Sequence, residues 1–174
     1  ATGLASRLDR TPARQAVIGG GIRESVAALA GDVILFDDAP RKQWRVALIN
    51  IGERDIIDLT DEAEFERAVD YLIDRSRALG ADRVIVAGAA PAPDRLDIAA
   101  AYQRLLVRVC RDNHAALIDS AAVWRESPDY ERAFTAGGNP RVRTAQPDMT
   151  PGGPGVSLYN RLADACIAAF APSY

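Results

Sequence analysis

Residues 45–51 read RVALINI and are followed by Gly52. A continuous apolar run of this kind is typical of a strand that is buried on both faces of a parallel sheet. Residues 83–88 (RVIVAG) and 115–119 (AALID) have the same character, and residues 15–19 (QAVIG) form a shorter run. We therefore predict a strand in each of these segments.

Helical patterns alternate with these runs. After Asp61, which we expect to cap a helix, apolar residues recur at helical spacing until Gly80. Residues 97–112 and 156–170 carry the same spacing, and residues 23–30 form a shorter helical pattern. Strands that alternate with helices in this way predict an α/β fold with a mostly parallel, doubly wound sheet and right-handed crossovers.

Length and composition indicate a single globular domain over residues 1–174. The sequence is 48% apolar and 26% charged, with a net charge of -3 and arginines that are scattered among acidic residues. This pattern does not indicate a nucleic-acid partner. No apolar run approaches the roughly 20 residues of a membrane span, and no signal peptide opens the chain. We expect a soluble protein.

The residues that hold metals and cofactors are scarce. The sequence has one histidine and two cysteines, Cys110 and Cys166, both on apolar helix faces. We expect two packed thiols, no metal site and no cofactor. Three glycines at 19–21 could form a phosphate loop, but Glu24 stands where another glycine is needed. A tight turn is the favoured interpretation.

One long segment carries little sign of regular structure. Five glycines and four prolines lie between residues 135 and 157, so we expect no helix or strand to run through it. Arg141 and Arg143 lie there and could bind an acidic or carbohydrate ligand. An ordinary exposed loop is the slightly favoured alternative.

Ligands of doubly wound sheets bind beyond the carboxyl ends of the strands. That rule places residues 19–21, 52–55, 88–93 and 119–124 along one rim. Asp119 and Trp124 would line the cleft there, although a packed tryptophan near a strand end is at least as well supported. Asp55 is expected to brace the rim loop. A cation site is the less favoured alternative for the acidic residues that follow the strand, which are Glu53, Asp55, Asp58 and Asp61.

These segments, in this order, resemble the sequence blocks of the SGNH (GDSL-type) hydrolases. Residues 17–25 (VIGGGIRES) resemble the block whose glycine lends its backbone N–H to the oxyanion hole, and Gly21 is the matching position. Residues 47–55 (ALINIGERD) resemble a strand followed by Gly-x-Asn-Asp. Asp148 and the helix at 158–170 resemble the last block, Asp-x-x-His-Pro. The resemblance covers nearly the whole chain and implies a three-layer, flavodoxin-like fold that hydrolyses esters and acyl groups.

The chain departs from the family at the positions of the catalytic residues. The family's serine follows the first central strand, and residues 1–4 (ATGL) resemble the stretch just after that serine. We therefore expect the first strand and the nucleophile to lie outside this sequence. Arg54 matches the asparagine that donates to the oxyanion, and Pro151 matches the general-base histidine. The only histidine, His114, is expected in a solvated loop on the wrong side of the sheet.

Two functional hypotheses follow from the resemblance and the departures. The favoured one is a degenerate esterase-like domain that binds a carbohydrate-like ligand through Gly21, Arg54, Asp55 and Trp124, or serves as a structural module of a larger assembly. The alternative is an active esterase, lipase or carbohydrate deacetylase whose nucleophile lies on another segment. Asp148 would then be the base, with Gly21 in the oxyanion hole.

A partner is also expected. A doubly wound sheet without its central strand leaves unpaired inner edges, which are costly. Another polypeptide or an upstream segment should complete the sheet. An unrelated flavodoxin-like domain that binds a flavin is a third interpretation, which absorbance spectroscopy of the purified protein would reveal.

Overall fold

The computed structural model describes residues 46–78, 80–137, 139–144 and 147–170. Its central sheet has three parallel strands in the order β1-β2-β3, with bounds Val46–Asn50, Arg83–Ala87 and Ala116–Ile118. The predicted α/β fold with a parallel sheet is confirmed, and each of these strands lies within a predicted one. The strand expected at 15–19, the helix at 23–30 and Gly21 lie outside the described residues.

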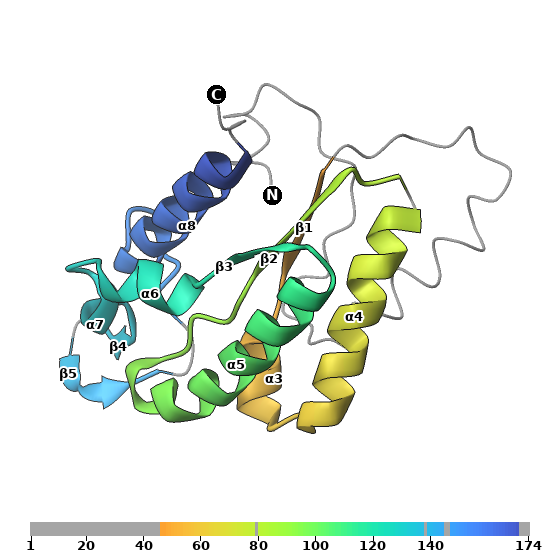
Figure 1. The fold of residues 1–174 in the computed structure, drawn as a ribbon. Coiled ribbons are helices and arrows are strands. Elements are labelled where there is room, and N and C mark those ends of the chain that lie inside the picture. The colour runs from red at the N-terminus through yellow and green to blue at the C-terminus, as the bar shows by residue number, and fades with distance from the viewer. Residues whose placement is uncertain (1–45, 79, 138, 145–146, 171–174) are drawn as a thin grey trace, which may run out of the picture.

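Helices cover both faces of the sheet (Figure 1). On one face α4 (Glu62–Ala78) packs on β2, and α5 (Leu96–Asp112) packs on β3 and on α4. On the other face α8 (Pro154–Phe170) packs on β2 and β3. These are the layers of a flavodoxin-like fold. Shorter elements lie in the connections, namely α3 (Glu53–Asp58), η1 (Pro93–Arg95), α6 (Ser120–Arg125) and α7 (Tyr130–Ala133).

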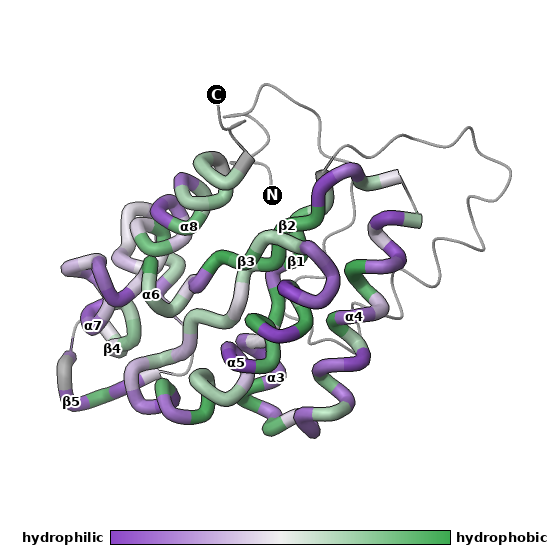
Figure 2. Tube along the Cα trace, in the orientation of Figure 1, coloured by the Kyte–Doolittle hydropathy of each residue, from purple (hydrophilic) through white to green (hydrophobic). Residues whose placement is uncertain are grey.

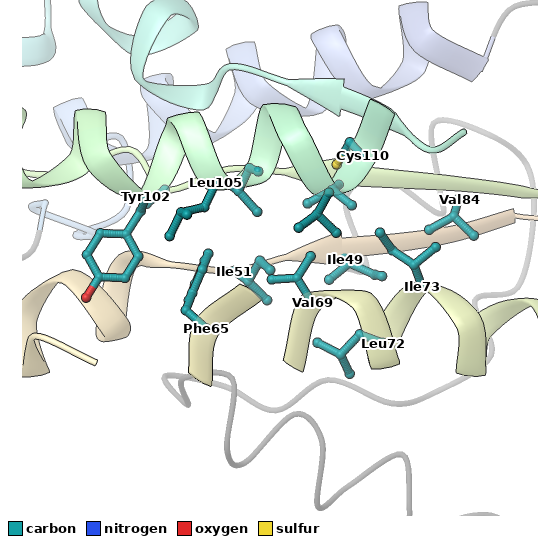
Figure 3. Packing of buried hydrophobic residues seen from close by; sticks show 14 of the residues in the cluster. Ile49, Ile51, Phe65, Val69, Leu72, Ile73, Val84, Tyr102, Leu105 and Cys110 are labelled. Carbon is teal, nitrogen blue, oxygen red and sulfur yellow. The ribbon is translucent and has the colours of Figure 1, made fainter. Parts of the chain in front are cut away.

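The larger core lies between the sheet and the helices α4 and α5 (Figure 3). Its sheet side includes Ile49 and Val84, and its helix side includes Phe65 and Tyr102, whose rings meet edge to face with centroids 4.9 Å apart. Along the tube of Figure 2 the strands are largely hydrophobic, whereas α4 and α5 alternate between polar and apolar turns. The periodic apolar residues that predicted these helices therefore form their buried faces.

The core on the other face is smaller and is built on α8. Ile85, Ala87 and Ile118 of the sheet pack with Leu162 and Cys166 of α8. This layer leaves β1 incompletely covered. Side chains alternate along a strand, and while Ala47 and Ile49 point into the larger core, Leu48 is 38% exposed and Asn50 is also exposed.

Local predictions for the long helices hold. The Asp61 carboxylate accepts a hydrogen bond from the backbone N–H of Glu64 at 2.9 Å, as a cap does. Gly80, with φ 94°, follows the end of α4.

Cys110 and Cys166 are buried free thiols, and burial raises the pKa of Cys110 to about 11. No helix within the described ranges is both long and apolar enough to cross a membrane.

The segment 135–157 is more regular than expected, and the prediction that no strand runs through it is wrong. Its first part is an antiparallel hairpin of β4 (Thr135–Ala136) and β5 (Asn139–Arg143), which pairs Thr135 with Arg143 and contains a register shift. Gly137, with φ 56°, lies in the turn. Pro140 lies in β5, and proline, which has no N–H to donate, occurs in strands mainly at edges and bulges.

Candidate functional site

The carboxyl ends of the three strands meet at one edge of the sheet, as predicted. Ile51 donates its N–H to the carbonyl of Ala87 at 3.2 Å, and Gly88 donates to the carbonyl of Ile118 at 3.1 Å. Directly beyond this edge lie α3, after β1, and α6, after β3 (Figure 1). The described part of the rim consists of residues 52–55, 88–93 and 119–124.

A close approach of two loops fixes the middle of the rim. Gly52 has φ 104°, and a Cβ there would lie 3.0 Å from the Cβ of Ala89. The chain therefore turns from β1 into α3 directly against the segment that follows β2. Only glycine combines this left-handed backbone with so close a neighbour.

Asp55 and Arg54 are adjacent but have different surroundings. Asp55 is 2% exposed, and its Oδ1 accepts a hydrogen bond from the Thr60 hydroxyl at 3.1 Å. Its carboxylate thereby connects α3 to the loop that follows this helix, whereas the expected brace was of the rim loop. The Arg54 side chain is 51% exposed, and its Nε donates to the Asp58 carboxylate at 2.7 Å along the same helix. The guanidinium is thus engaged on the surface of α3.

Asp148 is fixed at the beginning of α8. Its N–H donates to the carbonyl of Ala133 at 2.7 Å, and its carbonyl accepts from the N–H of Gly155 at 2.9 Å. Its Oδ1 accepts from the N–H of Thr150 at 3.0 Å. Hydrogen bonds from the backbone and side chain of Thr150 lower the pKa of Asp148, so this carboxyl is ionised at neutral pH. Pro151, at the position of the family's histidine, is exposed.

Asp119 and Trp124 both belong to α6. Asp119 caps this helix, since its Oδ1 accepts from the N–H of Ala122 at 2.9 Å. Trp124 is 1% exposed, with its ring centroid 5.0 Å from that of Tyr159 and 6.1 Å from that of Phe134. This placement matches the alternative of a packed tryptophan. Its indole Nε1 is buried without a hydrogen-bond partner among the described residues.

A contact that the sequence analysis missed joins Glu53 and Tyr159. The Tyr159 hydroxyl donates to Oε2 of Glu53 at 3.3 Å, linking the first residue of α3 to α8. Burial raises the pKa of Glu53, and the hydrogen bond from Tyr159 lowers it by a smaller amount. Burial and the charge of Glu53 also raise the pKa of Tyr159. The sequence signal was slight, namely a glutamate directly after the strand and its glycine.

The remaining candidates lie away from the rim. His114 is exposed, with φ 49°, in the turn between α5 and the amino end of β3, which is the opposite edge of the sheet. Arg141 and Arg143 are exposed on β5, where Arg143 pairs with the Glu131 carboxylate at 2.6 Å. Within the described ranges, no group of three or more His, Cys, Asp or Glu side chains is placed to hold a metal ion.

Solved structures with the same arrangement include several hydrolases. A lipolytic protein of the G-D-S-L family from Veillonella parvula superposes with a TM-score of 0.64 at 14% identity, covering 87% of this chain and 75% of that one. TesA gives 0.61 at 16% identity over 87% and 73% of the two chains. A proposed SGNH hydrolase from Slackia heliotrinireducens gives 0.58 at 17% identity over 85% and 80%.

Sequence comparison alone does not detect this likeness. No protein-family model matches the chain, and no curated protein matches it in sequence. At identities this low the structural matches establish the fold. They agree with the resemblance that the order of the rim segments indicated. The chain has the α/β fold of the SGNH, or GDSL-type, hydrolases.

Proposed function

We propose that this chain is an SGNH-type domain that does not perform Ser-His catalysis with its own residues, and that it acts as a ligand-binding or structural module of a larger assembly. The observation that carries the proposal is the position of His114. It is the only histidine in the sequence, and it lies exposed at the edge of the sheet opposite to the rim. Within this sequence, a nucleophile at the rim therefore has no imidazole within reach of its proton.

The other positions of the machinery support the same conclusion. Pro151 has no titratable group at the position of the base, and the Arg54 guanidinium at the position of the oxyanion donor pairs with Asp58. Loss of the base from such a catalytic unit typically lowers turnover by a factor on the order of a million. Backbone donors alone do not restore such a loss.

A polar, carbohydrate-like ligand at the rim is the binding role that we propose. Arg54 is exposed and could turn from Asp58 to a ligand hydroxyl or carboxylate, while Gly21 would offer a backbone N–H. Asp55 and Trp124, both buried, would shape the wall behind the ligand. Arginine and backbone donors are groups that commonly orient a polar ligand in a cleft.

The ligand proposal predicts a difference between two variants that break the same ion pair. Arg54→Ala should weaken the binding of soluble oligosaccharides, measured by titration calorimetry, because it removes the donor. Asp58→Ala frees the guanidinium and should leave binding intact. Both should change the free energy of unfolding by less than about 0.5 kcal/mol, because the pair is exposed. If both variants lost binding equally, the role of Arg54 would be contradicted. The same holds if Arg54→Ala bound an oligosaccharide as tightly as the parent chain does.

We also propose that another polypeptide or an upstream segment completes the sheet beside β1. Within the described residues β1 pairs only with β2, so no described strand lies along its other edge. Leu48 and Asn50 are exposed on the face that α8 leaves open. A strand added at this edge, with a helix over that face, would satisfy the backbone and cover Leu48.

Hydrolysis of p-nitrophenyl acetate tests the catalytic part of the proposal. The purified chain should release p-nitrophenol no faster than buffer does. Asp148→Ala and the control Asp129→Ala, which replaces the half-buried carboxylate just before α7, should be indistinguishable from it. The parent chain could instead hydrolyse the ester well above the rate in buffer. If Asp148→Ala then abolished this turnover and Asp129→Ala preserved it, the alternative of an active ester hydrolase that uses Asp148 would be established.

A further inference from the structure

One side-chain contact joins the two helical layers at the rim. The Tyr159 hydroxyl, on α8, donates to Oε2 of Glu53 at 3.3 Å, and Glu53 is the first residue of α3. α8 packs on one face of the sheet, whereas α3 packs against α5, which covers the other face. The contact therefore runs between the layers at the edge of the sheet where α/β folds place their ligands.

The Glu53 end of the contact is held by the turn before it. Gly52, with φ 104°, makes the turn from β1 into α3. The Ile56 N–H donates to the carbonyl of Gly52 at 3.0 Å, which is the first hydrogen bond of this helix. Arg54 and Asp55 follow Glu53 within the same six-residue helix. A displacement of Glu53 therefore acts on the backbone that carries both of these side chains.

The Tyr159 end is held by packing. Its partly buried side chain packs against the cluster around Trp124 and also against the cluster between α8 and the sheet. The rings of Tyr159 and Trp124 meet edge to face with centroids 5.0 Å apart. Gly155, whose N–H donates to the carbonyl of Asp148 at 2.9 Å, lies four residues before Tyr159. Residues with this spacing lie one turn apart on the same face of a helix. Tyr159 is thus directly linked through α8 to the turn that holds Asp148.

We propose that the contact between Glu53 and Tyr159 is a clasp that couples the two sides of the rim, so that α3 with Arg54 and the beginning of α8 with Asp148 open together. A ligand that displaces one side would thereby shift the other side as well. Coupling of this kind is demonstrated by a change on one side whose effect is measured on the other.

Native-state amide hydrogen exchange of the free chain tests the clasp, with each variant measured on the side that it does not touch. Glu53→Ala should speed the exchange of the Gly155 amide on α8 by about fivefold, and Tyr159→Phe should do the same for the Ile56 amide on α3. A fivefold change corresponds to about 1 kcal/mol, the usual net contribution of one hydrogen bond. The double variant should exchange no faster than either single variant, because both substitutions remove the same contact.

Tyr71→Phe is the matched control, because it removes the same hydroxyl group from an exposed position on α4. It should leave both amides at their parent rates. The Ala115 amide, which donates to the carbonyl of Cys110 at 2.8 Å near the opposite edge of the sheet, should not change in any variant.

Two results would overturn the clasp. In the first, either single variant leaves the distant amide at its parent rate. In the second, the amides of Ile56, Gly155 and Ala115 all exchange faster by the same factor, which indicates general destabilisation. These measurements use neither a ligand nor an ester, so their outcome is independent of the proposed binding role and of the catalytic test.

Discussion

Replacement of Trp124 with alanine is expected to lower the free energy of unfolding by about 3–5 kcal/mol. The indole is 1% exposed and packs between the rings of Tyr159 and Phe134, where α6 and α7 meet α8. Its removal leaves a cavity between α6, α7 and α8. These helices cannot fill the cavity unless they move. Urea unfolding followed by far-ultraviolet circular dichroism measures the loss.

Trp124→Phe separates packing from a polar role of the same residue. Phenylalanine keeps an aromatic ring and removes the buried Nε1, which has no hydrogen-bond partner among the described residues. We expect less than half of the loss that alanine causes, because the deleted donor contributes no bond to the folded state. A loss as large as that of alanine would show that the N–H has an important partner. A stable alanine variant would contradict the placement of the ring in the core.

The parts of the fold that could be predicted from the sequence are those with a long, regular signal. Residues 83–88 predicted β2 because a strand buried on both faces must be apolar throughout, and the structure buries it from Val84 onward. The hairpin of β4 and β5 could not be predicted in this way. Its strands have two and five residues, and one contains Pro140. Their pairing depends on tertiary contacts rather than on propensity. Helices such as α7, with four residues, are too short to show a period.

The candidate site also has parts that local sequence predicts and parts that it does not. The role of Asp61 as a cap depends on a neighbour three residues away, so local chemistry suggested it. The contact between Glu53 and Tyr159 spans 106 positions in sequence. Nothing in either local segment requires the other, and only the crossing of the sheet by α8 brings them together. The strands and helices of the rim are therefore predictable from local patterns, whereas contacts between distant segments are not.

Gly155→Ala is expected to lower the free energy of unfolding by about 2–3 kcal/mol, at the upper end of the usual penalty for overpacking. A Cβ at this position would overlap with the carbonyl oxygen of Asp148 and lie 2.9 Å from its carbonyl carbon. Both atoms are backbone, so no rotamer change can relieve the contact. The loss should appear even though alanine is the better helix former by about 1 kcal/mol. Equilibrium urea unfolding checks it.

Gly152→Ala is the control, because it lies in the turn that precedes α8 and has no atom within 4 Å of an added Cβ. Its φ of 75° makes alanine unfavourable by about 1 kcal/mol through backbone strain alone. The comparison separates the contact with Asp148 from the general effect of adding a methyl group near the beginning of α8. If Gly155→Ala were instead stabilising, as helix propensity alone would have it, the Asp148 carbonyl could not be packed on the first turn of α8. The hydrogen bond from the Gly155 N–H to the Asp148 carbonyl would then not hold Asp148 at the beginning of α8.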